Sequence, residues 1–206
     1  RADSVNPIYD YCSQYVTDGI LEYVIVTHAH QDHYAGFATG KNVDSLLDKF
    51  VVKNIIKFAK TNQTTGTLYK NFNRELDEST ERNGTNVYTA LDCYQNKNGG
   101  KQIYDISENI ELEMLYQEYY EQKSKTENNY SVCFTINQKI SETKTNKYLF
   151  TGDLESDGEK SLVVENNIGE VELYKAGHHG SKTSSSKELL KEIKPKIVCV
   201  CCCAGS

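Results

Sequence analysis

All five histidines of this chain fall within two short motifs. The motifs are residues 27–33, Thr-His-Ala-His-Gln-Asp-His, and residues 177–181, Gly-His-His-Gly-Ser. Neutral imidazole is the commonest protein ligand for zinc and similar ions, and carboxylates complete such ligand sets. Three histidines and one aspartate within six residues are too dense for one face of a helix, so the first motif is typical of a strand that ends in a loop. The pattern predicts a metal site at the end of that strand.

The length and composition fit a single domain over residues 1–206. With 38% hydrophobic and 25% charged residues, the composition is typical of a soluble globular protein. The longest apolar stretch, residues 197–204, is far too short to cross a bilayer. We therefore expect no membrane span in this chain.

The net charge is −6, and no run of Lys and Arg in the sequence could follow a nucleic-acid backbone by itself. Two bound divalent cations would reduce this charge to −2 and would place positive charge at the site. An anionic substrate would then be attracted to the metals rather than to a basic patch.

The chain has seven cysteines, four of which lie in one strand-like run at Cys199, Cys201, Cys202 and Cys203. Neighbouring side chains on a strand point to opposite faces, so these cysteines cannot all form disulfides. A reducing compartment is the simpler interpretation. A zinc site made of these cysteines would lack the paired C-x-x-C spacing.

Hydrophobic periodicity and turn residues predict a mixed α/β (α+β) fold, with sheets covered by helices and polar side chains at the strand ends. Strands are predicted over residues 23–27, 51–58, 110–116, 130–137, 147–151, 171–175 and 196–203. Helices are predicted over residues 7–17, 45–50, 68–82, 158–165 and 187–193. The segment 59–109 is polar, and beyond its one helix it shows only a loop around residues 96–100.

The spacing within the first motif suits two ions. His28 and His30 can reach one ion, while Asp32 and His33 turn to a second. Paired sites of this kind hold an oxygen nucleophile between two metals roughly 3.5–4 Å apart. Asp153 follows the predicted strand 147–151 and a flexible glycine, which puts it in a position to bridge both ions.

The second motif offers two adjacent imidazoles. On an extended segment they would point to opposite sides, so we assign His179 as a metal ligand and His178 as a general acid. The Ser-rich segment that follows predicts a capping box between Ser185 and Glu188 at the start of the next helix. Amide groups at that helix start, with Lys182 nearby, could also hold a phosphate oxygen.

These residues resemble the metallo-β-lactamase superfamily, whose H-x-H-x-D-H signature is matched by His28, His30, Asp32 and His33. Thr-Gly-Asp at 151–153, together with His-His-Gly-Ser-x-x-Ser at 178–184, is similar to the hydrolase domain of the ComEC-type DNA-uptake proteins. The resemblance is strongest over residues 22–37 and 128–198. It implies an αββα sandwich that holds two divalent metal ions, Zn or Mn.

The chain departs from that superfamily in two ways. Where many members place a further histidine, this chain has Asn128-Asn129-Tyr130-Ser131, which is similar to the Asn-Asn-x-Ser of the ComEC-type branch. Asn129 would then be a weak ligand of the first ion, and the site with Asp32, His33, Asp153 and His179 would be the tighter one. Relatives also begin earlier and continue past the last strand, so we expect a domain truncated at both ends.

The resulting hypothesis is metal-dependent hydrolysis of a phosphodiester, either in nucleic acid or in a smaller phosphoester. Asp32 would orient the nucleophile as well as bind metal, and His178 would protonate the leaving oxygen. One alternative keeps the fold and metals but acts on a lactone, thioester or β-lactam. Another is a binding or scaffold domain without activity. The loop 180–186 favours phosphate among these.

Overall fold

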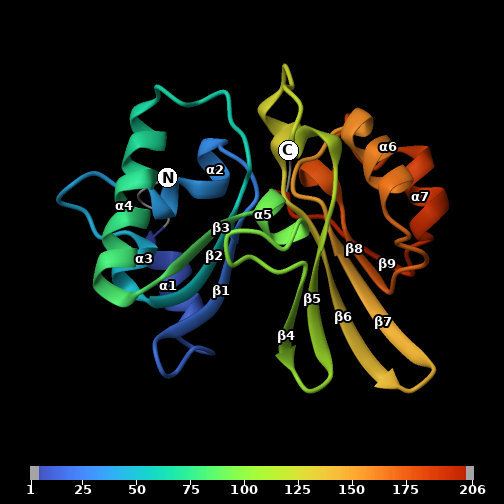
Figure 1. Ribbon diagram of the computed structural model, residues 1–206, viewed down its shortest axis with the longest axis horizontal. Helices are drawn as coiled ribbons and strands as arrows, with labels where there is room; N and C mark the ends of the chain where they lie inside the picture. Colours follow the sequence, from blue (N-terminus) through green and yellow to red (C-terminus); the bar gives the residue numbers. More distant parts are fainter. Residues whose placement is uncertain (1–4, 203–206) are drawn as a thin grey trace.

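Two β-sheets lie side by side in the centre of the molecule, with helices on both outer sides (Figure 1). The structure is a computed structural model, and it describes residues 5–202. The order of layers is helices, sheet, sheet, helices (Figure 1). The predicted mixed α/β architecture is therefore confirmed.

The first sheet is fully parallel, with the strand order β1 (Ile20–Val26), β2 (Val51–Lys57), β3 (Asn86–Thr89). Parallel neighbours need a crossover between them, and helices supply it here. The helices of this half are α1 (Val5–Cys12), α2 (Gln31–Tyr34), η2 (Ala35–Phe37), α3 (Leu46–Lys49) and α4 (Thr67–Asn83). Ser45 and Asp48 form a capping box at the start of α3, so the turn before β2 is set locally.

The second sheet has the order β4 (Ile103–Ser107), β5 (Ile110–Leu115), β6 (Cys133–Ser141), β7 (Lys144–Phe150), β8 (Leu173–Lys175), β9 (Ile197–Cys199). The first four strands form an antiparallel meander, and the last two join in parallel. Its helices and turns are α5 (Ala90–Tyr94), η3 (Glu118–Tyr120), η4 (Glu127–Tyr130), α6 (Ser156–Glu165), η5 (Gly177–Gly180) and α7 (Lys187–Ile193).

Two hydrophobic clusters hold these layers together. The larger one joins the two sheets to each other and to α4, and it includes an edge-on contact between the rings of Tyr23 and Tyr104, whose centroids are 5.3 Å apart. The smaller one lies between the second sheet and the last two helices, where Leu162, Leu189 and Ile193 pack with Leu149 and Tyr174. Burial of this apolar surface is the main force that fixes α6 and α7 on the sheet.

Most predicted elements are present, with boundaries that differ by a few residues. The strand expected at 130–137 begins only at Cys133, because residues 127–130 form η4, and the strand expected at 196–203 is limited to Ile197–Cys199. Residue 203 lies outside the described residues. Three elements in the polar middle were missed, namely β3, α5 and β4. Both of these strands are short, and their extended form depends on pairing with β2 and β5 rather than on their own sequence.

Within residues 5–202, no helix combines the length and the apolar character that crossing a bilayer requires. Six cysteines in that range carry free thiols, namely Cys12, Cys93, Cys133, Cys199, Cys201 and Cys202.

Two adjacent leucines of α7 provide a test of the smaller cluster. Leu189 is 0% exposed and Leu190 is 37% exposed. We expect Leu189→Ala to lower the free energy of unfolding by about 2–5 kcal/mol, because it opens a cavity that the sheet cannot fill. Leu190→Ala should lower it by less than ~1 kcal/mol. Equal effects in urea unfolding would show that α7 does not pack as described.

Candidate metal centre

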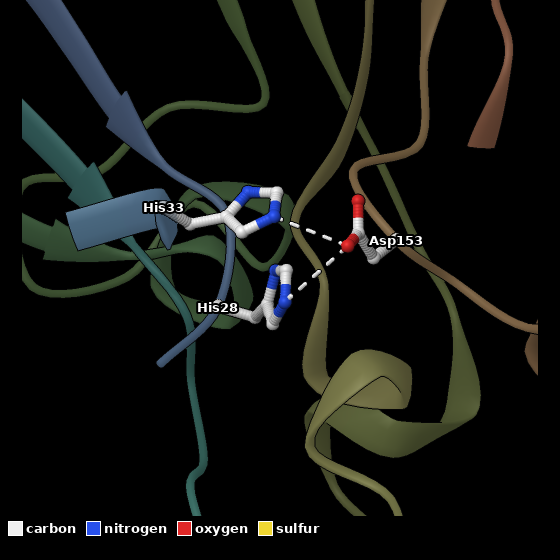
Figure 2. Close-up of side chains that lie close together, drawn as sticks. All are labelled: His28, His33 and Asp153. Carbon is white, nitrogen blue, oxygen red and sulfur yellow. Dashed lines mark ion pairs between the residues drawn. The ribbon is translucent and has the colours of Figure 1, made fainter. Parts of the chain in front are cut away.

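Side chains from the ends of three strands meet at one point between the two sheets. His28 and His33 follow β1, Asp153 follows β7, and His179 follows β8. Figure 2 shows His28 and His33 pointing from the first sheet toward Asp153 on the second. Carboxyl ends of neighbouring parallel strands share one edge, which is why Asp153 after β7 and His179 after β8 come together. The packing of the two sheets against each other brings His28 and His33 to the same place.

The carboxylate of Asp153 is the centre of this group. Its Oδ2 atom lies 3.1 Å from His33 Nε2, 3.4 Å from His179 Nε2 and 3.8 Å from His28 Nε2. The side chain is only 3% exposed. Its other oxygen, Oδ1, is buried and has no hydrogen-bond partner among the described residues. This carboxylate therefore has an acceptor that the surrounding protein leaves unsatisfied.

Charge and burial act in opposite directions on these groups. Burial raises the pKa of Asp153, but the hydrogen bond from His33 and the nearby His28 and His179 outweigh it and hold that pKa at about 2. Burial and the neighbouring His33 lower the pKa of His28 to about 2. A neutral His28 beside an ionised Asp153 is the protonation state that metal ligation requires.

A second group of ligands lies closer to the solvent. Asp32 Oδ2 is 3.5 Å from His33 Nε2 and 3.6 Å from His179 Nε2, and the Asp32 side chain is 68% exposed. Potential ligand atoms thus form two sets, the buried His28, His33, Asp153 and the outer Asp32, His33, His179. His33 belongs to both.

His30 lies beside His28, but outside the two three-ligand sets. Within residues 5–202 it joins neither three-ligand set, although its Nδ1 lies 3.0 Å from His28 Nε2. The expected division placed His28 with His30 and Asp32 with His33. The structure keeps His28 next to His30 and also groups His28 with His33, since the chain turns into α2 at Gln31 and brings His33 back to the cluster.

The outer nitrogens of these imidazoles are held by oxygen atoms. The Thr27 hydroxyl lies 3.1 Å from His28 Nδ1 and 3.4 Å from His33 Nδ1. His179 Nδ1 donates to the carbonyl of Cys201 at 2.9 Å. An Nδ1–H bound in this way leaves the Nε2 lone pair free to face the cluster. Thr27 had no assigned role from sequence, although its position beside the motif could have suggested one.

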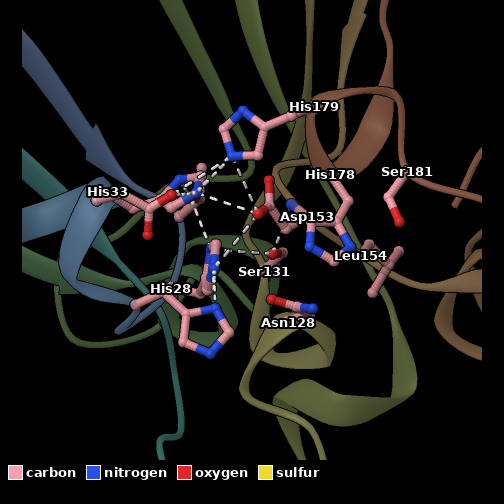
Figure 3. A network of polar contacts seen from close by, with 12 residues as sticks. His28, His33, Asn128, Ser131, Asp153, Leu154, His178, His179 and Ser181 are labelled. Atoms are coloured by element: carbon pink, nitrogen blue, oxygen red, sulfur yellow. Dashed lines mark hydrogen bonds and ion pairs between the residues drawn. The ribbon is translucent and has the colours of Figure 1, made fainter. Parts of the chain in front are cut away.

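Ser131 links the backbone amide of Asp153 to the His28 ring. Its hydroxyl accepts a hydrogen bond from the Asp153 amide at 3.0 Å and lies 3.4 Å from His28 Nδ1 (Figure 3). Gly152, just before Asp153, has φ +56, and a Cβ there would lie 2.8 Å from the Ser131 hydroxyl. This close approach requires glycine at position 152.

The neighbouring asparagines divide their roles differently from the prediction. Asn129 Oδ1 accepts a hydrogen bond from the Glu155 amide at 3.1 Å, so it is engaged away from the metal ligands. Asn128 is drawn in the same view (Figure 3), and its side-chain NH₂ donates to the Glu155 carboxylate at 2.9 Å. Its Oδ1 is buried without a partner among the described residues. The oxygen expected from Asn129 is thus engaged with the Glu155 amide, whereas the Asn128 oxygen is unpaired among the described residues.

The two adjacent histidines form a tight turn and not the extended segment we expected. Both have left-handed backbone angles, φ 48 at His178 and φ 55 at His179. Their side chains nevertheless diverge, with His179 at the cluster and His178 Nδ1 2.9 Å from the Thr183 hydroxyl. The His178 amide also donates to the Gly152 carbonyl at 3.1 Å, which ties this turn to Asp153. Such strain in non-glycine residues clusters at functional sites.

A buried glutamate that sequence reasoning missed anchors the loop after this turn. Glu159 is 0% exposed, and its carboxylate accepts the amides of Ser185 at 2.6 Å and Ser186 at 2.7 Å. The N-cap of α7 is Ser186, whose hydroxyl accepts from the Leu189 amide, so the predicted capping box is wrong. Because these amides already bind a carboxylate, they are not free to hold a phosphate.

The outer ligands open onto a cleft of about 630 Å³. Asp32, His178 and His179 line it, together with Gly180, Ser181, Cys201 and Cys202. Of the six predicted metal ligands, the structure thus brings Asp32, His28, His33, Asp153 and His179 together, with His30 beside His28.

No family model matches this chain. Two known proteins are similar to about a quarter of it. Recombination protein 2 of Haemophilus influenzae is 36% identical over 55 residues, which is 27% of this chain and 7% of that protein. ComE operon protein 3 of Bacillus subtilis is 38% identical over 60 residues, which is 29% of this chain and 8% of that protein. The alignments therefore span less than a tenth of either relative's length.

The Thr27 hydroxyl offers a test of the ligand geometry. We expect Thr27→Val to weaken binding of added Zn²⁺ about 10- to 100-fold, because the imidazoles of His28 and His33 lose the oxygen that orients them. Thr27→Ser keeps the hydroxyl and should bind like the wild type. Competition with a chromophoric chelator gives both affinities, and equal values for Val and Ser would contradict this role.

Glu159 can be tested through stability. Replacing it with Gln sets an NH₂ group against a backbone amide, so we expect Glu159→Gln to lower the free energy of unfolding by about 1–3 kcal/mol. The exposed Glu188, on α7 itself, is the matched control, and Glu188→Gln should change little. If the two variants unfold at the same urea concentration, Glu159 does not anchor the loop.

Proposed function

We propose that this chain is a metal-dependent hydrolase of phosphodiester bonds in nucleic acid and belongs to the metallo-β-lactamase superfamily. The observation that carries the proposal is the cluster of imidazoles around the buried Asp153, beside an open cleft. The order of layers, with two sheets between helices, supports the superfamily assignment.

The ligand atoms fit a divalent ion. Two ligands of one tetrahedral ion, each about 2.0–2.2 Å from it, lie about 3.3–3.6 Å apart. Here Asp153 Oδ2 is 3.1–3.8 Å from the three imidazole nitrogens, and His33 Nε2 is 3.2 Å from His179 Nε2. The unpaired Asp153 Oδ1 adds an oxygen ligand. Nitrogen and carboxylate ligands of this kind suit Zn²⁺ or Mn²⁺.

Two ions would divide these ligands. His28, His33 and Asp153 would hold one, with His30 close to His28. Asp32 and His179, with the shared carboxylate of Asp153, would hold the other. Bound ions of this class lower the pKa of water and neutralise charge that develops on a phosphoryl group.

Two side chains would orient the attacking water and protonate the leaving oxygen. Asp32 is exposed on the cleft and carries an acceptor that can orient an attacking water. His178 lines the same cleft, and its Nδ1 lies 2.9 Å from the Thr183 hydroxyl. Its other ring nitrogen would protonate the leaving oxygen.

The choice of nucleic acid over other substrates rests on the comparisons. The name Recombination protein 2 connects one relative with DNA, and ComE operon protein 3 agrees with the ComEC-type resemblance of the motifs. The amides at the start of α7 do not add to the argument for a phosphate substrate, because they donate their hydrogen bonds to the Glu159 carboxylate. A lactone or thioester hydrolase of the same fold remains the alternative, and hydrolysis of such an ester without phosphodiester turnover would favour it.

The primary test combines metal content with turnover. We expect protein loaded with Zn²⁺ or Mn²⁺ to hydrolyse bis(4-nitrophenyl) phosphate and to lose activity on chelation. Asp153→Asn should lose both metal and turnover, because it removes the negative charge shared by the ligands. The exposed Asp157→Asn is the control. Metal-loaded wild-type protein without phosphodiester turnover would disprove the proposal and favour a binding or scaffold domain.

A second test separates the two adjacent histidines. A general acid typically contributes about 10²–10⁴-fold to rate, and more for a poor leaving group than for nitrophenolate. We expect His178→Ala to keep its metal, to lose most turnover on an alkyl phosphodiester and to lose far less on the nitrophenyl ester. His179→Ala should lose metal and both activities. If His178→Ala loses its metal, then His178 is the ligand and His179 the general acid.

A further inference from the structure

A second cavity, of about 480 Å³, lies at the carboxyl end of β2. It is formed between the loop 58–66 and the segment 123–130, and Figure 1 shows both rising at the same end of the molecule. The residues that give it its chemistry are Lys57, Lys60, Lys123, Tyr69 and Asn62, and we call it the lysine–tyrosine pocket.

The pocket gathers positive charge in an acidic protein. Lys57 and Lys60 lie close together in the sequence, whereas Lys123 comes from a distant segment, and the net charge of the chain is −6. Within residues 5–202, none of their ammonium groups makes an ion pair or a hydrogen bond. Lys57 is half-buried, with its Nζ 5.6 Å from the centroid of the Phe58 ring. Unpaired ammonium groups that line a cavity favour an anion.

An aromatic ring accompanies this charge. Tyr69 is partly exposed in the pocket and packs on Phe58, with ring centroids 6.3 Å apart. Proteins that bind single-stranded nucleic acid combine ammonium groups along the phosphates with aromatic side chains on which bases stack. The pocket has both.

The walls of the pocket are fixed to each other. The Asn62 amide donates to Glu127 at 2.8 Å, and its side chain donates to the Ser124 carbonyl at 3.1 Å. The Tyr130 hydroxyl donates to Asn62 Oδ1 at 3.2 Å. These bonds cross-link the loop 58–66 to the segment 124–130, so the cavity is formed before a ligand arrives.

The pocket shares a wall with the metal centre. Tyr130 lines the pocket, and the next residue, Ser131, contacts His28 and Asp153. On the sheet, Lys57 pairs with Val26, two residues before His28. A strand whose scissile phosphate lies at the metals would therefore have a neighbouring nucleotide within reach of the pocket.

We propose that the lysine–tyrosine pocket binds one nucleotide of single-stranded nucleic acid beside the metal centre, with its phosphate at the lysines and its base on Tyr69. The substrate role of this binding rests on the proposed function. The binding itself does not depend on it, so the two can fail separately.

The test measures affinity for a fluorescein-labelled oligothymidine by anisotropy, in chelator, so that no cleavage occurs. We expect Lys60→Ala/Lys123→Ala to weaken binding and to reduce the slope of log affinity against log salt by about 0.7 per lost phosphate contact. Tyr69→Leu should weaken it about 5-fold or more, and Tyr69→Phe should not. Lys139→Ala/Lys144→Ala, in the β6–β7 hairpin, removes the same charge and should bind like the wild type.

Turnover of bis(4-nitrophenyl) phosphate by the metal-loaded variants separates the two proposals. Pocket variants that lose oligonucleotide binding but keep this turnover support both. If the metal-loaded wild type shows no turnover but the pocket variants lose oligonucleotide binding, the binding proposal is supported and the proposed hydrolase function is refuted. The pocket is refuted if the wild type does not bind the oligonucleotide, or if the control double variant loses as much affinity as the pocket variants.

Discussion

The metal centre is built around one buried carboxylate, that of Asp153. Removing an ionised carboxylate from water is costly unless opposite charge and hydrogen bonds replace the lost hydration. The Ser131 hydroxyl, bonded to the Asp153 amide, and the three imidazoles surround this group, yet Oδ1 is left without a partner among the described residues. A cation in this position would satisfy the atom that the protein does not.

Backbone contacts hold the ligands in place around that carboxylate. The turn at His178 is bonded to Gly152, and the Ser156 amide donates to the Thr183 carbonyl at 2.9 Å. The loops after β7 and β8 therefore behave as one unit. The loop after β1 joins it through the Val132 amide, which donates to the Thr27 carbonyl at 2.9 Å. A metal site needs such support, because its ligands must stay within fractions of an ångström of their positions.

The net charge of this protein does not show where its charged side chains lie. The net charge is −6, yet the cluster is rich in imidazole and an adjacent cavity is lined by three lysines. Local potential, and not the overall charge, attracts an anionic ligand to a cleft. The lysine-lined cavity and the metal centre adjoin at Tyr130 and Ser131, which relates ligand binding in one to chemistry at the other.

The sequence by itself determined the ligand types and the long periodic elements, such as the strand at 51–58 and the helix at 68–82, because their patterns are local. Tertiary structure alone decided that His28 shares a carboxylate with His33 and that Asn129 accepts a hydrogen bond from the Glu155 amide. It also decided that β3 and β4 form, through their pairing with β2 and β5. The same holds for the hydrogen bond between Glu159 and the Ser185 amide, 26 positions apart, which anchors the loop before α7. Contacts over such separations depend on how the sheets and helices pack, and no local pattern records them.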